Sequence, residues 1–422
     1  MTARSTGEEP GRPQVAVAQI GARRRYAVPR ALHAAGMLSR LFTDAASEDL
    51  PGVLRRLLPG RRQSALAARR PQLPSTRHVS LPEVSLAAFV FRRLYRGDQF
   101  RAWAVQNRHF CRRVARRLAP ADEGVYVFNG AGRELLEYAR DRGLWCFVDQ
   151  TSAALHVDRA LLREEAALWP GWEARDHYAA PGVDEMIERE EAEWRLAHGI
   201  VCGSEYVQRT LAARGVDGRC AVVAYPAPPS GGPAAVTPPP PPGPLRALFV
   251  GTLQLRKGLP YLLHAAKRLK GHVVWRLAGP SWLSPDAEAE LRGHCELLGA
   301  LPAADISRQL AWADVMVLPT LSEGSANACF EALASATPVI TTPNAGSVVE
   351  DGQSGFIVPI RDSEILSERL GRLAGDRRLV QAMASSARAR AASFDETRYS
   401  DGLASALLAA MATGNGAVER ER

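Results

Sequence analysis

Residues 314–333 read DVMVLPTLSEGSANACFEAL: an apolar run, then a loop of small residues, then a helical pattern. The continuous apolar run is typical of a strand that is buried on both faces of a parallel sheet. The small residues of SEGSAN expose backbone N–H groups, because a ligand can approach the main chain closely there. A helix beginning near Asn327 would point its N-terminus at the same place, and helix N-termini attract phosphate. The stretch therefore predicts an anion site at the edge of an α/β sheet.

Two carboxylates accompany this loop. Glu323 lies in it, and Glu331, eight positions later, falls in the first turns of the expected helix. A carboxylate beside a phosphate site is suited to accept hydrogen bonds from hydroxyl groups, on ribose or on a sugar. A nucleotide-diphosphate sugar offers hydroxyl groups at two ends and a diphosphate between them, so it is the ligand class that this pattern favours.

The same alternation of strand, turn and helix runs through the whole chain. Strand-like runs occupy residues 14–20, 125–129, 144–150 and 199–204 in the first half, and 245–252, 273–279, 314–320, 338–342 and 355–359 in the second. Helical patterns separate them, and one of these helices is expected around 285–299. Such a rhythm predicts parallel sheets covered by helices on both faces.

A proline-rich run divides the chain into two halves. At 422 residues the chain is long enough for two domains, and we expect an α/β protein with two Rossmann-like, doubly wound parallel-sheet domains facing each other across a cleft. Ligands of such sheets bind at the carboxyl ends of the strands. The predicted segments are a disordered tail (1–13), an N-terminal acceptor-side domain (14–226), a Pro/Gly-rich linker (227–244), a C-terminal nucleotide-sugar domain (245–392), a helix packing back on the first domain (393–412) and a flexible tail (413–422).

Residues 246–360 resemble glycosyltransferase family 4, the retaining transferases with the two-domain GT-B fold. The resemblance is carried by the E-x7-E signature, here Glu323 and Glu331, and by FVGTLQLRKGLPYLLHAAKRL and LLGALPAADISRQLAWADVMVLPT upstream. The first half matches only loosely, through GARRRYAVPRALHAAG and the general layout. The resemblance implies a hexosyltransferase that uses a nucleotide-diphosphate sugar and retains the anomeric configuration.

The resemblance also implies residue roles. Glu323 would contact donor-sugar hydroxyls, and Lys257 would stabilise the leaving diphosphate, so these two are the expected catalytic residues. Glu331 would hold the ribose, and backbone near Pro280 and Leu301 would frame the base. Further donor-binding positions are Gly21, Thr252, Arg256, Leu301, Gly324, Ser325, Ala326 and Asn327. On the acceptor side the expected residues are Asp149 and His156.

One position departs from the family pattern. The family usually has an arginine five residues before the lysine, where this chain has Thr252. Either Arg256 or the basic turn Arg23–Arg25 could supply the missing cation.

We expect neither a metal ion nor another cofactor, since the chain has no D-x-D motif and no His/Asp cluster at ligand spacing. The expected donor is a UDP-, GDP- or ADP-sugar; the acceptor, a glycan, a lipid-linked intermediate or a small molecule, stays open. Two alternatives remain: a GT-B nucleotide-sugar epimerase resembling the UDP-N-acetylglucosamine 2-epimerases, and a non-catalytic GT-B scaffold.

Positive charge is concentrated in residues 51–120, which hold sixteen arginines against two acids, Glu83 and Asp98. This pattern is typical of contact with an anionic membrane surface, or else of a solvated face. Nucleic acid is not expected, because no recognition motif accompanies the charge. No stretch approaches the roughly 20 apolar residues of a membrane span, and the N-terminus lacks the apolar core of a signal peptide. Six scattered cysteines fit reduced thiols. We therefore expect a cytoplasmic protein, peripheral on the inner face of the cell membrane.

Overall fold

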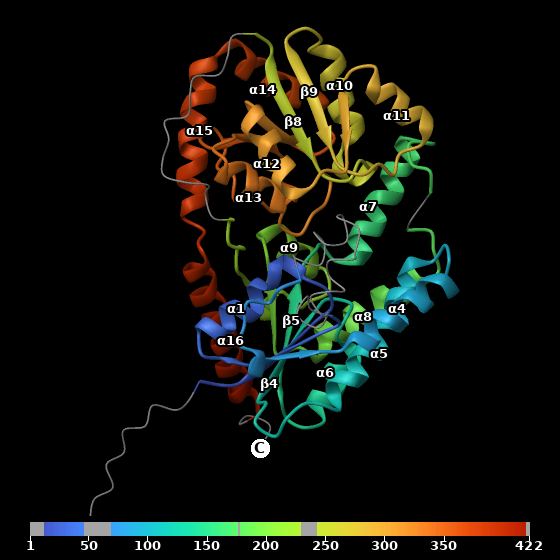
Figure 1. Ribbon diagram of the computed structural model, residues 1–422, viewed down its shortest axis with the longest axis vertical. Helices are drawn as coiled ribbons and strands as arrows, with labels where there is room; N and C mark the ends of the chain where they lie inside the picture. Colours follow the sequence, from blue (N-terminus) through green and yellow to red (C-terminus); the bar gives the residue numbers. More distant parts are fainter. Residues whose placement is uncertain (1–11, 46–68, 176–177, 229–242, 419–422) are drawn as a thin grey trace, which may run out of the picture. The chain divides into compact units, whose positions relative to one another are not determined.

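A computed structural model describes residues 12–45, 69–175, 178–228 and 243–418, and contains two α/β sheets (Figure 1). The first has the order β3-β2-β1-β4-β5-β6-β7 and the second the order β10-β9-β8-β11-β12-β13. Every pairing in the second sheet is parallel, as are the pairings from β3 to β5 in the first. The prediction of two parallel-sheet α/β domains is confirmed.

The strands of the first sheet are β1 (Val15–Gln19), β2 (Leu38–Thr43), β3 (His78–Ser80), β4 (Gly124–Phe128), β5 (Trp145–Gln150), β6 (Gly199–Cys202) and β7 (Cys220–Val222). Those of the second are β8 (Leu245–Val250), β9 (Val273–Ala278), β10 (Glu296–Gly299), β11 (Val315–Leu318), β12 (Val339–Thr341) and β13 (Gly355–Ile357).

The α-helices in chain order are α1 (Ala27–Ala34), α4 (Pro82–Leu94), α5 (Gln99–Ala115), α6 (Arg133–Arg140), α7 (Leu155–Leu168), α8 (Gly182–Leu196), α9 (Glu205–Ala212), α10 (Leu259–Arg268), α11 (Pro285–Arg292), α12 (Ala303–Trp312), α13 (Asn327–Ala334), α14 (Ser363–Gly375), α15 (Arg377–Ala392) and α16 (Glu396–Val418). None of these described helices is both long and apolar enough to cross a membrane.

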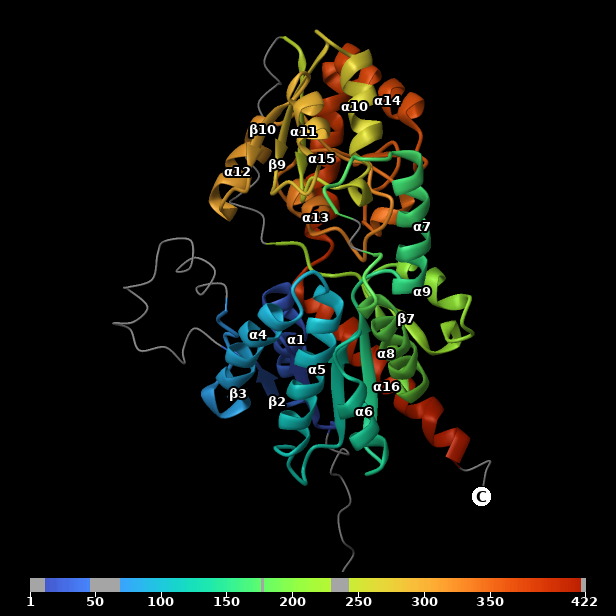
Figure 2. The same ribbon diagram turned by 90° about the vertical axis from the view of Figure 1, so that its right-hand side faces the viewer.

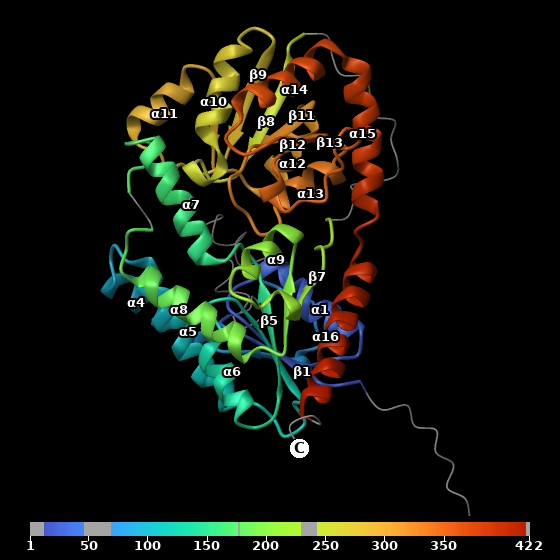
Figure 3. The same ribbon diagram turned by 180° about the vertical axis from the view of Figure 1, so that it is seen from behind.

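The second sheet is built around β11, whose four residues are all buried between β8 and β12 (Figure 3). Strands buried on both faces are continuously apolar, which is why DVMVL could be recognised. Because the strands are parallel, the carboxyl ends of β8, β11 and β12 lie at one edge of the sheet. The loops that follow these strands therefore gather there.

The chain divides into two compact units, each made from separate stretches. The first contains residues 1–149, 188–200 and 400–422, and the second residues 150–187 and 201–399, as far as these are described. Within the first unit, α16 is tied to α1 by a hydrogen bond of 2.8 Å from Ser400 Oγ to the Ala31 carbonyl. Within the second unit, α7 and α9 join the second sheet and its helices.

Two predicted helices end earlier than expected, and strands β2, β3 and β10 were not predicted. The helix expected around 285–299 ends at Arg292 with Gly293 as its cap, and residues 296–299 form the edge strand β10 beside β9. Residues 26–38 have the apolar spacing of a helix, but α1 stops at Ala34, because Gly36 takes a positive φ and Leu38 already begins β2.

Several predicted segments lie wholly or partly outside the described residues. They are most of the 227–244 linker, most of the N-terminal tail, the end of the C-terminal tail, and residues 51–68 of the basic region.

A glycine fixes the turn between β8 and α10. Gly258 has φ +71°, and a Cβ built on it would lie 1.9 Å from the Pro319 carbonyl oxygen. Gly271 has a similar φ of +84° but nothing within 4 Å of its Cβ position. We predict that Gly258→Ala lowers the free energy of unfolding by more than about 3 kcal/mol, whereas Gly271→Ala lowers it by about 1 kcal/mol from backbone strain alone. Denaturant titration measures both, and equal losses would show that the close approach at Gly258 is unimportant.

Candidate functional site: a carboxylate between two cations

The carboxyl edge of the second sheet brings Glu323 between two cations. Glu323 lies in the loop that follows β11. Arg256 and Lys257 belong to the 3-10 turn η5 (Leu255–Lys257), which follows β8. Arg256 Nη1 is 3.1 Å from Glu323 Oε1, and the Lys257 ammonium pairs with the same oxygen. The neighbouring parallel strands thus bring Glu323 to a pair of adjacent cations that precede it by more than 60 residues in the sequence.

Burial and charge act in opposite directions on this cluster. Burial raises the pKa of Glu323, but the charges of Arg256 and Lys257 outweigh it, so the net pKa lies below the usual value. Burial lowers the pKa of Lys257, and its attraction to Glu323 only partly compensates. Burial also opposes the charge on Arg256, but nearby carboxylates raise its pKa. Two cations and one carboxylate leave a net positive charge, which suits an anionic ligand.

Backbone hydrogen bonds hold the loop around Glu323 in place. The Glu323 N–H donates to the Asn344 carbonyl and the Ala326 N–H to the Ala345 carbonyl, both at 3.0 Å. The Ala326 N–H, expected from the sequence to face the donor, is therefore already engaged within the chain.

Gly324 is required by a close approach of backbone. A Cβ at this position would lie 1.7 Å from the Thr151 carbonyl oxygen. Its own carbonyl accepts a hydrogen bond of 2.5 Å from Ser204 Oγ. Gly324 thus packs the loop against two segments that come from much earlier in the chain.

Donor groups remain open where α13 begins. The helix starts at Asn327 and has no side-chain cap. Among the described residues, the buried Ser325 hydroxyl has no hydrogen-bond partner, and no acceptor takes the backbone N–H of Ser325 or Asn327. Glu331 is half-buried one turn into the helix, as the sequence predicted. A helix N-terminus with unused donors beside a positive cluster can bind phosphate oxygens.

A buried relay, missed in the sequence analysis, leads away from this loop. The Tyr206 hydroxyl donates to Ser322 Oγ at 2.9 Å, and Ser322 Oγ donates to the Asp158 carboxylate. Burial raises the pKa of Asp158 to about 6, with Arg256 opposing and Glu323 adding to the effect. Asp158 lies in the stretch DQTSAALHVDR (149–159), and nothing in that sequence indicates that α7 reaches a loop 164 residues later.

A second carboxylate on α7 strengthens this attachment. Glu165 is fully buried and accepts hydrogen bonds from the Tyr261 hydroxyl at 2.7 Å and from Arg361 Nε at 2.9 Å. Helix α7 is thereby fixed to α10 and to the loop that precedes α14.

The remaining predicted donor residues of this unit lie in the loops after β8, β9 and β10. Thr252 is half-buried just beyond β8. The Pro280 carbonyl accepts the Leu253 N–H at 2.8 Å, which joins the loops after β8 and β9. Leu301 is half-buried two residues beyond β10. In the described part of the chain, no group of three or more His, Cys, Asp or Glu side chains could hold a metal ion.

Gly21 and Asp149 belong to the first unit, as does the basic turn Arg23–Arg25. Gly21 has φ +73°, and its N–H donates to Asp44 Oδ1 at 2.8 Å. Asp149 is fully buried and accepts the Tyr126 hydroxyl at 2.8 Å. His156, the second residue of α7, belongs to the second unit together with Glu323.

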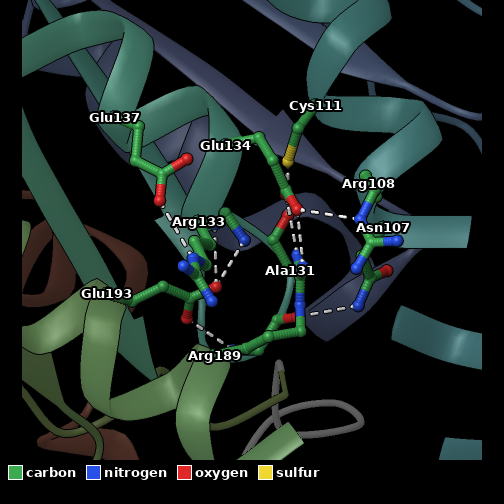
Figure 4. A network of polar contacts seen from close by, with 11 residues as sticks. Asn107, Arg108, Cys111, Ala131, Arg133, Glu134, Glu137, Arg189 and Glu193 are labelled. Carbon is green, nitrogen blue, oxygen red and sulfur yellow. Dashed lines mark hydrogen bonds and ion pairs between the residues drawn. The ribbon is translucent and has the colours of Figure 1, made fainter. Parts of the chain in front are cut away.

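The glycine turn after β4 in the first unit is occupied by the protein's own carboxylate (Figure 4). Glu193 on α8 accepts the N–H groups of Gly130 at 2.6 Å, Gly132 at 2.7 Å and Arg133 at 3.0 Å. Burial raises the pKa of Glu193 to about 8, against these hydrogen bonds. This helix N-terminus is therefore satisfied internally, in contrast to that of α13.

The part of the chain that carries this site is similar in sequence to known proteins. Residues 244–376 match the family model described as "Glycosyl transferases group 1". This stretch is therefore similar to group 1 glycosyltransferases. The amylovoran biosynthesis glycosyltransferase AmsK of Erwinia amylovora is 32% identical over 146 residues, which are 31% of this chain and 36% of AmsK. The matched region spans about a third of the length of the curated relatives.

Solved structures resemble the whole chain. Sucrose-phosphate synthase from Thermosynechococcus elongatus aligns over 95% of this chain and 100% of its own, with a TM-score of 0.64 and 16% identity. The Anabaena protein HepE, solved in complex with UDP and glucose, aligns over 94% of this chain and 100% of its own, with a TM-score of 0.59 and 13% identity. At such low identity the likeness shows the fold alone, which is GT-B. Glu323, Lys257 and α13 all lie inside the residues that match the group 1 glycosyltransferase model.

The Asp158 relay predicts a pH dependence. Its pKa of about 6 lies above the ordinary 3.8, so the native protein holds the proton more tightly than the unfolded chain. The contribution of this protonation to the free energy of unfolding is fully present below pH 3.8 and is lost as the pH rises through about 6. Asp158→Asn keeps an acceptor for Ser322 but cannot ionise. We predict that it is more stable than the wild type above pH 7, by at most about 3 kcal/mol, and equally stable near pH 4.

Denaturation curves from pH 4 to 8 measure this difference. Asp286→Asn, on the exposed first turn of α11, is the control and should follow the wild-type pH profile. If Asp158→Asn also followed the wild-type profile, Asp158 would titrate with an ordinary pKa.

Proposed function

We propose that this protein is a retaining glycosyltransferase that transfers a hexose from a nucleotide-diphosphate sugar to an acceptor hydroxyl without a metal ion. The observation that carries the proposal is the Glu323 carboxylate held between Arg256 and Lys257, beside the uncapped N-terminus of α13. This arrangement offers a carboxylate for sugar hydroxyls and positive charge for a diphosphate at the same place.

In this proposal the donor lies along the carboxyl edge of the second sheet. Its diphosphate accepts hydrogen bonds from the N–H groups and hydroxyl at Ser325 and Asn327 and lies against Lys257. Its ribose hydroxyls donate to Glu331 and its sugar hydroxyls to Glu323. The complex of HepE with UDP and glucose supports this donor class. Activity with UDP-, GDP- and ADP-sugars determines whether the base of the donor is uracil, guanine or adenine.

The chemical step breaks the bond between the anomeric carbon and the diphosphate oxygen, and the electron pair leaves with the nucleoside diphosphate. The acceptor oxygen forms the new bond on the same face of the sugar, and its proton passes to a phosphate oxygen of the leaving group. Charge accumulates on the diphosphate in the transition state, so fixed cations there lower the barrier. Lys257 supplies this stabilisation, and Arg256 keeps Glu323 ionised and oriented.

The acceptor is proposed to be a glycan or a lipid-linked saccharide. The name of AmsK, an amylovoran biosynthesis glycosyltransferase, supports an acceptor of saccharide type. A nucleotide-sugar epimerase would use a similar donor site but would consume the donor without transferring its sugar, so product analysis separates the two functions.

Removing the Lys257 ammonium tests the proposal. Lys257→Ala should lower turnover by roughly 100- to 1,000-fold, the usual effect of losing one such stabilising group. Its fold should persist, because Arg256 still pairs with Glu323. Turnover is measured as nucleoside diphosphate released from UDP-, GDP- and ADP-hexoses in EDTA, with octyl glycosides as acceptors, and NMR of the product gives its anomeric configuration.

Lys267→Ala is the matched control, since that exposed lysine pairs with the exposed Glu290, and its loss should change turnover by less than about twofold. Full activity of Lys257→Ala would remove Lys257 from the mechanism. An inverted product would refute retention, and loss of all activity in EDTA that Mg²⁺ or Mn²⁺ restores would refute metal independence.

A further inference from the structure

Helix α4 in the first unit presents a large apolar surface to solvent. Four of its residues expose between 54% and 71% of their surface, and they are four of the ten large hydrophobic residues that are exposed in the described chain. We define them as the α4 face: Leu86, Phe89, Val90 and Leu94. Their spacing of three or four residues places them on one side of the helix.

The opposite side of α4 is its core side. Val84 and Ala88 are buried there, and α4 packs along α5 (Figure 2). The two faces are both apolar, so burial against α5 accounts for only one of them. Exposed large side chains scattered singly are ordinary, but four gathered on one helix mark an interaction site.

Exposed arginines lie on α4 and on the helix α5 that packs beside it. Arg92, Arg93 and Arg96 are exposed at the end of the helix and just beyond it, and Arg101 is exposed at the start of α5. Further exposed arginines, Arg112, Arg116 and Arg117, lie at the end of α5 and just after it.

Little negative charge offsets these arginines. The acids of this segment are Glu83 and Asp98. Asp98 is the N-cap of α5, where its carboxylate accepts the Arg101 N–H at 3.0 Å. The Oε1 atom of Glu83 lies 3.6 Å from Arg117 Nη2. The surface is thus both apolar and strongly cationic.

We propose that the α4 face docks on an anionic lipid bilayer, with its apolar side chains inserted between head groups and the neighbouring arginines over lipid phosphates. Apolar residues flanked by exposed arginines on a short helix are complementary to such an interface. A protein partner that matched this surface would need an apolar groove rimmed by acids, and a second copy of this face would be repelled by like charge. The proposal goes beyond glycosyl transfer and stands whether or not the chain turns over a donor.

Vesicle co-sedimentation tests it with the full chain. Vesicles of phosphatidylcholine with 30% phosphatidylglycerol should bind the protein in 0.1 M NaCl, whereas vesicles of pure phosphatidylcholine should bind at least tenfold less. Raising the salt to 0.5 M should also weaken binding, because the electrostatic part is screened.

Two pairs of substitutions separate the apolar and electrostatic contributions. Leu86→Ser with Phe89→Ser should lower the partition coefficient by at least about tenfold through lost insertion. Arg92→Glu with Arg93→Glu should lower it by more than about 25-fold, since each arginine near an anionic surface is worth roughly fivefold in binding. All four positions are exposed, so the variants should keep wild-type melting curves.

The controls change the same chemistry elsewhere. Leu408→Ser replaces an exposed leucine of α16, and Arg292→Glu with Arg308→Glu changes the net charge equally on α11 and α12. Both controls should bind like the wild type.

Three results would overturn the proposal. The first is no vesicle binding at 0.1 M NaCl. The second is an equal loss of vesicle binding in the charge control and in the Arg92→Glu, Arg93→Glu variant. The third is a wild-type dimer in analytical ultracentrifugation that becomes a monomer in the Leu86→Ser, Phe89→Ser variant. The last would assign the α4 face to a second copy of this chain.

Discussion

The side chains of Glu323, Arg256 and Lys257 are only partly exposed, and a charge that loses its partner in such surroundings is costly, so these three groups must stay together. That requirement explains the surrounding structure. The turn η5 needs Gly258 to approach Pro319, and the loop after β11 needs Gly324 to approach Thr151. The parallel order of β8 and β11 then places both turns at the same edge, where α13 begins. A ligand that displaced Glu323 from either cation would have to replace its charge, which a diphosphate can do.

The site is also connected to residues from the first half of the sequence. Helices α7 and α9 contribute Asp158 and Tyr206 to a relay whose central member is Ser322, the residue before Glu323. Asp158 therefore lies close to the loop that holds Glu323, and Arg256 and Glu323 both act on its pKa. In the first unit, by contrast, Glu193 occupies the corresponding glycine turn after β4. One helix N-terminus is thus satisfied by the chain itself and the other retains unused donors.

Local patterns were enough to predict the two parallel-sheet domains and the position of Glu323 and Glu331 around the start of α13. Buried strands, small-residue loops and helix starts can each be recognised from about ten consecutive residues. The edge strands β3 and β10 were missed because three or four residues cannot show a period of two. The relay through Asp158, Ser322 and Tyr206 could not be predicted, since it depends on tertiary packing between distant segments. The apolar α4 face was hidden for a related reason: the sequence shows that Leu86 and Phe89 are apolar but not which side of the helix packs on α5.

The central claim is that the carboxyl edge of the second sheet binds a nucleoside diphosphate through fixed positive charge. The most direct measurement is a thermal-shift titration with UDP, GDP and ADP in the presence of EDTA. Binding at a hundred times the dissociation constant adds about 2.7 kcal/mol of stability, so we predict a clear rise in melting temperature with one of the three nucleotides, and a much smaller rise for Glu331→Ala at the same concentration. If none of the nucleotides raised the melting temperature of the wild type, the claim would be contradicted and the unused donors at α13 would need another ligand.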